Sequence, residues 1–175
     1  MNLLWVVTGA VSCSITPFWA RWIRLQRPDI CVEYVMTPSA TRFLSPAAIK
    51  NIGAAPVMID KWDDVGDRPL HVEMSVWLDA IIVHPCTFDY MSRLALGIVN
   101  TPSLLTAACI EKPIIVAPIP PPGGMNGPVY KKHLESLAER GNITVLPPEE
   151  TANLNPHADQ SFGAASFESC LRELQ

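Results

Sequence analysis

Short apolar runs alternate with longer segments of mixed polarity along this chain. The apolar runs cover residues 3–8, 30–36, 80–84, 113–117 and 143–146. The last four are rich in Val and Ile and carry few charges, which is typical of strands buried on both faces of a parallel sheet. The pattern therefore predicts five buried strands.

The segments between these runs carry helix signals. Thr16-Pro17 has the form of an N-cap with proline at the first helical position and opens a helix to about Gln26. Further helices are expected over residues 39–50, 89–108, 128–140 and 166–174. Strand–helix alternation with these lengths predicts a doubly wound α/β sheet, and 175 residues suit a single domain over residues 1–175.

Ligands of such sheets bind outside the carboxyl ends of the strands. That rule predicts a site in residues 8–14, 37–43, 85–90 and 118–126. The first two segments, TGAVSCS and TPSATRF, are rich in hydroxyl groups and run into helix starts, where free N–H groups hold phosphate. Ordinary helix caps explain one such loop, whereas two at one edge favour a phosphate-bearing ligand. Neither G-x-G-x-x-G nor G-K-[ST] is present, so no dinucleotide fingerprint or P-loop is indicated.

Composition narrows the class of partner. Charged residues make up only 17% of the chain, which suggests that other subunits cover much of its surface. The net charge of −4, without a Lys/Arg cluster, gives no reason to expect nucleic acid. Five scattered cysteines without a C-x-x-C pair indicate neither a metal site nor a disulfide framework, and buried free thiols in the cytoplasm are the simpler interpretation.

The apolar start of the chain raises the question of targeting. MNLLWVVTGAVSCS lacks a basic n-region, and charged helix-like sequence follows it, so we expect no signal peptide. No apolar run approaches the roughly 20 residues of a membrane span, so we expect no membrane association. The segment APIPPPGGMNGP is too rich in Pro and Gly for a strand or helix; a lid and a plain surface connection both remain open.

One stretch, LHVEMSVWLDAIIVHPCTFDY, carries a family resemblance. It matches, at the same spacing, three motifs that occur together in one known protein family: a histidine, a W-A-D-x-x-x-x-A-P segment and a P-A-S-A-N-T motif. The last motif is degraded here to PCTFDY. The matching residues are His71, Trp77, Asp79, Pro85 and Thr87. On these motifs the chain resembles the homo-oligomeric flavin-containing cysteine decarboxylases. They include phosphopantothenoylcysteine decarboxylase and enzymes that decarboxylate the C-terminal cysteine of lantibiotic and linaridin peptides.

The resemblance implies a Rossmann-like (flavodoxin-like) fold, FMN as cofactor with FAD as the alternative, a trimer or dodecamer, and no metal. Carried over by position, the flavin-binding residues are Gly9, Ala10, Val11, Ser12, Ser39, Phe43, Thr87, Phe88 and Ala117. Ser39 would bind the flavin phosphate, and Phe43 would pack near the ring system. Thr87, Phe88 and Asp89 would line the flavin and the substrate.

The chemistry of the family requires an electron sink. The flavin first oxidises the cysteine side chain to a thioaldehyde, and the C=S group then accepts the electrons released with CO₂, which gives an enethiol. His71 matches the active-site histidine, a residue type suited to proton transfer near neutral pH. Asp89, the second catalytic candidate, stands where the family has asparagine.

Two polar residues depart from the family pattern. An asparagine amide donates to a substrate carboxylate, whereas an ionised Asp89 repels it. Asp89 is therefore protonated when substrate binds, pairs with a cation or has another role, and it is also a candidate N-cap of the following helix. His84 stands where the family has alanine, and is either a second proton carrier or a core or interface residue.

The substrate clasp of the family, P-x-M-N-x-x-M-W, has two possible registers here. Met125 and Asn126 in GGMNGPVY match its Met-Asn pair and are the substrate-binding candidates together with Asp89. An ungapped match through the helix that follows aligns Pro118 with the first proline instead, and it places IPPPGG at the clasp.

The C-terminal region favours one branch of the family. The pantothenate enzymes carry a cysteine in an A-C-G-D segment, whereas this chain has no cysteine between Pro148 and Cys170, which is expected to be helical. The reaction should then stop at the enethiol, which indicates a decarboxylase of a ribosomally made precursor peptide ending in Cys. Phosphopantothenoylcysteine decarboxylase and a non-catalytic regulatory relative are the alternatives. A flavin prenyltransferase ranks lower because its glycine-rich first loop is absent.

Overall fold

A six-stranded parallel sheet forms the centre of the molecule. The computed structural model describes residues 1–62, 70–151 and 161–175. The strand order is β3-β2-β1-β4-β5-β6, the Rossmann order, so the predicted doubly wound α/β sheet is confirmed. The strands are β1 (Asn2–Val7), β2 (Cys31–Met36), β3 (Val57–Ile59), β4 (Ala80–Thr87), β5 (Ile114–Ile119) and β6 (Ile143–Val145).

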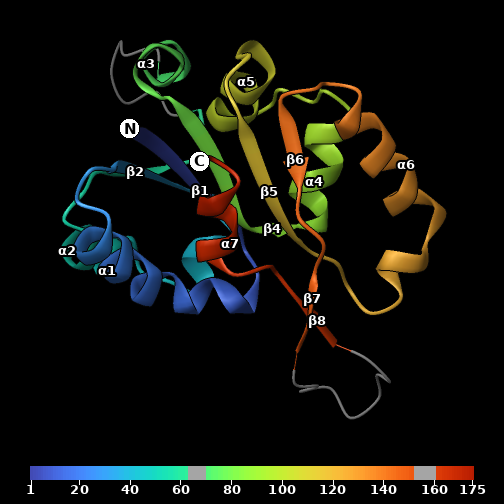
Figure 1. Cartoon of the computed structure of the whole chain (residues 1–175), viewed down its shortest axis with the longest axis horizontal. Coiled ribbons are helices and arrows are strands. Elements are labelled where there is room, and N and C mark those ends of the chain that lie inside the picture. The colour runs from blue at the N-terminus through green and yellow to red at the C-terminus, as the bar shows by residue number, and fades with distance from the viewer. Residues whose placement is uncertain (63–69, 152–160) are drawn as a thin grey trace.

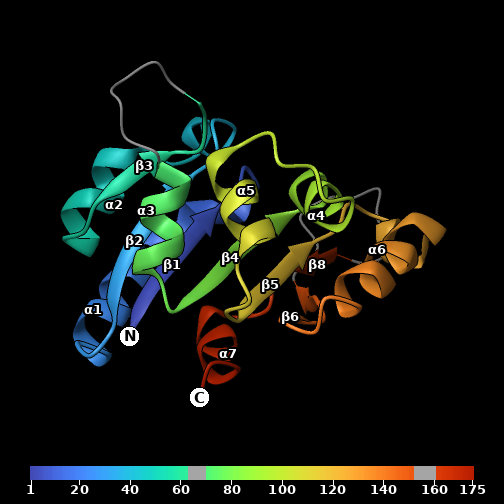
Figure 2. The ribbon, with the colours of Figure 1, turned by 90° about the horizontal axis from the view of Figure 1, so that it is seen from above.

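Helices cover both faces of the sheet (Figures 1 and 2). Helices α1 (Thr16–Gln26), α2 (Pro46–Gly53) and α7 (Phe167–Arg172) pack on one face. Helices α3 (Leu70–Trp77), α4 (Phe88–Ala95), α5 (Pro102–Cys109) and α6 (Pro128–Ala138) pack on the other. Trp5 of β1 faces the first layer and Val6 the second, because successive side chains of a strand point to opposite faces. Within the described residues, no helix is long and apolar enough to cross a lipid bilayer.

The helix expected over residues 89–108 is two helices, α4 and α5. Gly97 has a φ of +66°, the left-handed conformation that ends a helix at little cost. Its N–H donates to the carbonyl of Leu94, and the N–H of Ile98 donates to that of Arg93 (2.9 Å), which completes a Schellman cap. The chain then starts a new helix at Pro102.

The helix expected over residues 39–50 is also interrupted. A short 3-10 turn (Ala40–Arg42) follows β2, and α2 begins only at Pro46, which cannot donate the hydrogen bond that a helix interior requires. Three elements, β3, α3 and a hairpin of β7 (Glu149–Thr151) and β8 (Ser161–Gly163), were not predicted. Figure 1 shows this hairpin projecting from the body of the molecule.

The strands that lead to the expected site are longer than predicted. Strand β4 continues to Thr87 and β5 to Ile119, so part of the segments expected as loops belongs to the sheet. The register between β4 and β5 shifts between Val83 and Cys86, where Pro85 lies. Proline lacks the N–H that a regular ladder needs, which accounts for the irregularity.

His84 is a core residue. It is 4% exposed, and its Nε2 atom lies 2.9 Å from the carbonyl oxygen of Ala165. Burial lowers the pKa of His84 to about 4, despite the hydrogen bond to Ala165. The ring of Phe167 in α7 stacks on Trp5 beside it, with ring centres 3.7 Å apart. Of the two interpretations of His84, the structure favours the core residue.

Three of the five thiols are buried. Cys13, Cys86 and Cys170 lie in the core, Cys31 and Cys109 are exposed, and all five are free. The expectation of buried free thiols therefore holds for three of them. Cys170 is helical, as expected, and burial raises the pKa of its thiol to about 12.

Candidate functional site

The carboxyl ends of β1 and β4 meet where the strand order reverses, between β1 and β4 (Figure 2). Thr8, directly after β1, is 1% exposed. Its Oγ1 atom donates to the carbonyl oxygen of Pro85 and accepts from the backbone N–H of Thr87, both at 2.7 Å. One threonine side chain therefore fixes the end of β4 against the loop that follows β1.

Gly9 allows the loops after β1 and β2 to touch. A Cβ atom at Gly9 would lie 2.4 Å from Oγ of Ser39 and 2.7 Å from its carbonyl carbon. The Oγ atom of Ser39 lies 3.0 Å from Oγ1 of Thr37, which holds its hydroxyl in place. Only glycine fits this approach, and the two hydroxyl-rich loops of the sequence thus form one surface.

The residues after Gly9 enter a 3-10 helix (Val11–Ile15) with Ala10 at its N-cap position. Val11 is 69% exposed. Ser12 is partly buried, and its Oγ atom has no hydrogen-bond partner within the described part of the chain. A buried hydroxyl without a partner is costly and calls for one, and a phosphate oxygen of a bound ligand would supply it. The donor set of Gly9, Ser12 and Ser39 thus fits a phosphate-bearing group.

The other flavin-binding candidates differ in exposure. Phe43 is 45% exposed and follows the turn after β2. Thr87 is the N-cap of α4, where its Oγ1 accepts from the N–H of Tyr90. Phe88 packs toward α6, with ring centres 6.2 Å from Tyr130 and 6.0 Å from His133. Ala117 lies inside β5 and is completely buried in the core on the side of α1.

Asp89 pairs with a cation. Its Oδ2 atom lies 2.5 Å from Nη2 of Arg93, one helical turn later. Thr87, rather than Asp89, is the N-cap of the helix. Of the roles that the sequence left open for Asp89, the structure shows the pairing with a cation.

His71 lies at the start of α3 and is partly buried. Its ring meets that of Trp62 nearly edge-on, with centres 5.6 Å apart. Its Nδ1 atom is buried without a hydrogen-bond partner among the described residues. Helix α5 packs against both α3 and α4, so His71 and Asp89 lie on the two helices that flank α5.

A buried polar chain at the same edge was not predicted. Asp60, which follows β3 and is 2% exposed, accepts from the N–H of Ser103 at 2.9 Å and from its Oγ at 2.7 Å. Oγ of Ser103 lies 2.7 Å from the hydroxyl of Tyr90, and Tyr90 is the donor because the proton of Ser103 points to Asp60. Burial, with the charge of Asp60, raises the pKa of Tyr90 well above its ordinary value and keeps it a neutral donor.

Met125 and Asn126 lie in a short 3-10 turn (Gly124–Asn126) after β5, where Met125 is partly buried and Asn126 is exposed. The turn is closed by the N–H of Gly127, which donates to the carbonyl of Gly124 at 3.1 Å. Gly123 precedes the turn with a φ of +75°. Both registers of the clasp therefore lie on one folded segment that leads directly into α6.

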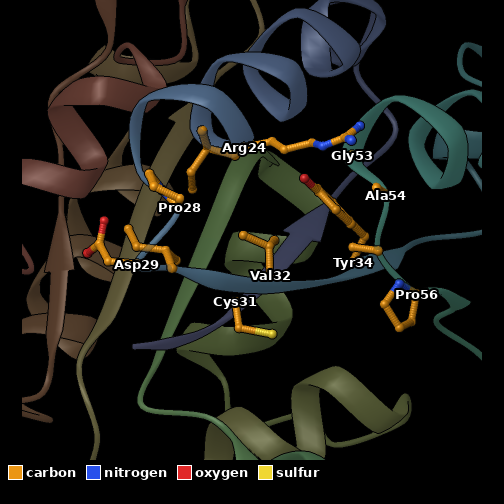
Figure 3. A pocket seen from close by; sticks show the side chains of 12 residues that line it. Arg24, Pro28, Asp29, Cys31, Val32, Tyr34, Gly53, Ala54 and Pro56 are labelled. Atoms are coloured by element: carbon orange, nitrogen blue, oxygen red, sulfur yellow. The ribbon is translucent and has the colours of Figure 1, made fainter.

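A cavity of about 430 Å³ lies elsewhere, near the amino end of β2 between α1 and α2 (Figure 3). Arg24 extends across it toward Gly53, and its Nη1 atom donates to the carbonyl of Ile52 at 3.3 Å. The ring of Tyr34 fills the space beside Gly53. Because ligands of this fold bind at the opposite, carboxyl edge, the cavity is distinct from the candidate site.

This strand order, with two touching hydroxyl-bearing loops at the carboxyl ends of β1 and β2, defines an α/β protein of the Rossmann type. The family model described as Flavoprotein matches residues 1–169, and the chain belongs to this family. Its cofactor is therefore of the flavin class. The resemblance noted in the sequence is confirmed.

Three relatives illustrate the similarity. The chain is 30% identical over 142 residues to the cypemycin cysteine dehydrogenase (decarboxylating) of a Streptomyces species, covering 81% of this chain and 73% of that one. The crystal structure of the cypemycin decarboxylase CypD matches with a TM-score of 0.75 and 28% identity over 83% of this chain and 82% of that one. The FMN-dependent cysteine decarboxylase TvaF from thioviridamide biosynthesis matches with a TM-score of 0.77 and 25% identity, over 85% and 90%.

A fourth match is to a longer protein. The bifunctional coenzyme A biosynthesis protein CoaBC of Escherichia coli K12 is 30% identical over 141 residues. These cover 77% of this chain and 33% of CoaBC, so the chain spans about a third of that relative.

Proposed function

We propose that this protein is a flavin-dependent enzyme that oxidatively decarboxylates the C-terminal cysteine of a ribosomally made precursor peptide and releases an aminoenethiol. The observation that carries the proposal is the 30% identity, over 142 residues, to the cypemycin enzyme. The contact between Gly9 and Ser39 supports it, because it joins the hydroxyl-rich loop after β2 to the loop after β1, which borders the switch point of the sheet.

The proposed cofactor is FMN, with FAD as the alternative. Gly9, Ser12 and Ser39 would hold the flavin phosphate; Ala10, Val11, Phe43, Thr87, Phe88 and Ala117 complete the proposed set. When bound, the flavin supplies the two-electron oxidation of the substrate cysteine. The relation to TvaF, described as FMN-dependent, favours FMN.

The side chains of this chain would position the substrate and move protons. His71, whose buried Nδ1 atom has no hydrogen-bond partner among the described residues, would exchange a proton with the substrate, and Trp62 restricts the orientation of its ring. Asp89, Met125 and Asn126 would contact the terminal residue of the peptide. Loss of CO₂ from the oxidised cysteine leaves a carbanion that the adjacent C=S group stabilises as an enethiolate.

Further copies of this chain are the second kind of partner that we propose, in a trimer or dodecamer located in the cytoplasm. Large apolar side chains are exposed on the 3-10 helix after β1 and on α1: Val11, Ile15, Phe18 and Leu25. Exposed apolar surface of this kind supports association between copies.

Mass spectrometry tests the reaction directly. A peptide ending in cysteine, incubated with flavin-loaded protein, should lose about 46 mass units, CO₂ plus two hydrogens. His71→Asn should abolish this loss while the flavin spectrum remains. Unchanged mass across a panel of peptides contradicts the proposal, and full biological activity of the His71→Asn variant would favour a regulatory, non-catalytic role.

Phosphopantothenoylcysteine decarboxylase is the second candidate, favoured by the match to CoaBC. That activity needs a thiol that returns the oxidised product to its reduced form. Cys170 is fully buried with a raised pKa, so it is poorly suited to this step. Turnover of phosphopantothenoylcysteine in preference to the peptides would reverse the order of the two candidates.

A further inference from the structure

Asp89 brings a negative charge to a site whose substrate ends in a carboxylate. On the proposed function, the carboxylate of the terminal cysteine lies beside the start of α4, and two like charges that close repel each other. We propose that Arg93 cancels the charge of Asp89 and thereby allows the site to bind a peptide that ends in a free carboxylate. This inference rests on the proposed function and names a positioning residue for it.

The ion pair is asymmetric in a way that suits this role. The side chain of Arg93 is 22% exposed, whereas that of Asp89 is 75% exposed. The cation is therefore held largely within the protein, and the anion faces solvent. An exposed pair of two mobile side chains contributes little, whereas here the guanidinium is largely buried and meets the carboxylate directly.

Two further contacts hold Arg93 in place. Its Cζ atom lies 5.7 Å from the centre of the Tyr90 ring, within the range of a cation–π interaction. Its Nη1 atom donates to Oδ1 of Asn100 at 3.3 Å. The Schellman cap at Gly97 reverses the chain after α4 and brings Asn100 back to the arginine.

The support continues into the sheet. The hydroxyl of Tyr90 donates to Ser103, which donates to Asp60 at the end of β3. The ring beneath Arg93 is therefore fixed at both its face and its hydroxyl. A buried chain of hydrogen bonds in which each donor has an acceptor confers rigidity on the groups above it. The Tyr90 ring, Asn100 and Asp89 thus hold the guanidinium from three sides.

The test separates charge neutralisation from direct contact with the substrate. The variants are Arg93→Met, which keeps the aliphatic stem, Arg93→Lys, and the double variant Asp89→Asn/Arg93→Met. Arg27→Met is the matched control, because Arg27 forms a comparable pair with Asp29 (2.8 Å) near the amino end of β2. The readouts are kcat and KM for a peptide ending in cysteine, together with the flavin content. We also measure the inhibition constants of the same peptide with serine in place of the terminal cysteine, both as the free acid and as the amide.

Arg93→Met should raise KM and the inhibition constant of the free acid by about tenfold, the scale for one uncompensated charge near a protein surface. The inhibition constant of the amide, kcat and flavin content should stay within about twofold, since no charge meets Asp89 there. Arg93→Lys should keep most of the wild-type affinity for the free acid. The double variant should recover that affinity, because the repelling carboxylate is gone, and Arg27→Met should match the wild type.

Three results would overturn the inference. The first is an equal change for acid and amide, which indicates a structural role. The second is failure of the double variant to recover, which indicates that Arg93 itself binds the substrate carboxylate. The third is an Arg93→Met variant that binds the free acid as tightly as the wild type does. If no peptide is decarboxylated, but Arg93→Met weakens binding of the free acid and not of the amide and the double variant recovers it, the inference stands and the proposed reaction fails.

Discussion

The backbone N–H of Thr87 and Oγ1 of Thr8 lie 2.7 Å apart, in a bond that joins the carboxyl ends of two neighbouring parallel strands. Because the same hydroxyl donates to Pro85, the loop after β1 and the first turn of α4 share one anchor. The candidate flavin and substrate residues on these two segments therefore hold a fixed spacing.

Thr8→Val should lower the free energy of unfolding by about 2 kcal/mol, since it leaves the buried N–H of Thr87 without its acceptor and removes a donor from Pro85. It should also weaken flavin binding, because the spacing of the two segments is lost. Urea denaturation and flavin titration measure the two effects. Thr144→Val, at an exposed position of β6, is the isosteric control and should change neither. Equal effects of the two variants would refute the anchoring role.

Gly9→Ala should abolish retention of flavin during purification. The new Cβ would lie 2.7 Å from the carbonyl carbon of Ser39 as well as 2.4 Å from its Oγ, so the two loops must separate. Adding Ser39→Gly should not restore retention, because the backbone clash remains. Gly127→Ala, where φ is −68° and the nearest atom lies 3.2 Å away, is the control. Flavin absorbance per protomer is the measurement, and a flavin-loaded Gly9→Ala protein would contradict the assignment.

The buried hydrogen bonds from Tyr90 through Ser103 to Asp60 predict which of two substitutions costs more stability. Tyr90→Phe removes one hydrogen bond and should cost about 1 kcal/mol of unfolding free energy. Ser103→Ala removes the bond to Tyr90 and the side-chain bond to the buried carboxylate of Asp60, and should cost about 3 kcal/mol. Chemical denaturation of both variants checks the order. A larger loss for Tyr90→Phe would mean that the Tyr90 ring, rather than the polar chain, carries the stability.

Acidification should destabilise the protein through His84. Burial lowers its pKa from 6.5 to about 4, so between these values the unfolded chain takes up a proton that the folded protein does not. The free energy of unfolding should therefore fall by about 2 kcal/mol from pH 7 to pH 5, with no further contribution once the pH is below about 4. His84→Gln, which does not titrate, should show a smaller decrease in urea denaturation. The same slope in both proteins would show that other groups dominate.

The central strands could be predicted from the sequence because each is largely a run of apolar residues. Five consecutive residues of β1, from Leu3 to Val7, are completely buried, and an uninterrupted apolar run is the sequence form of such a strand. Strand β3 escaped prediction because it has three residues at the sheet edge and is defined by its pairing with β2. The break between α4 and α5 was signalled by Gly97 and Pro102, and the helix interpretation of residues 89–108 overlooked both.

Some contacts of the candidate site could likewise be predicted from the sequence, and others could not. The meeting of Gly9 with Ser39 follows from the adjacency of β1 and β2, since both loops leave the same edge of the sheet. Arg93 could have been found, because a cation four residues after an acid on a helix is a local signal. The bond between Asp60 and Ser103 joins residues 43 positions apart, and only the packing of α5 on the sheet edge brings them together.

The stacking of Phe167 on Trp5 can form only late in the synthesis of the chain. Trp5 leaves the ribosome long before residue 167, whose aromatic ring covers it. Until then one face of β1 presents an indole to water or to a chaperone. This half of the domain therefore closes late, after nearly all of the sheet has been made.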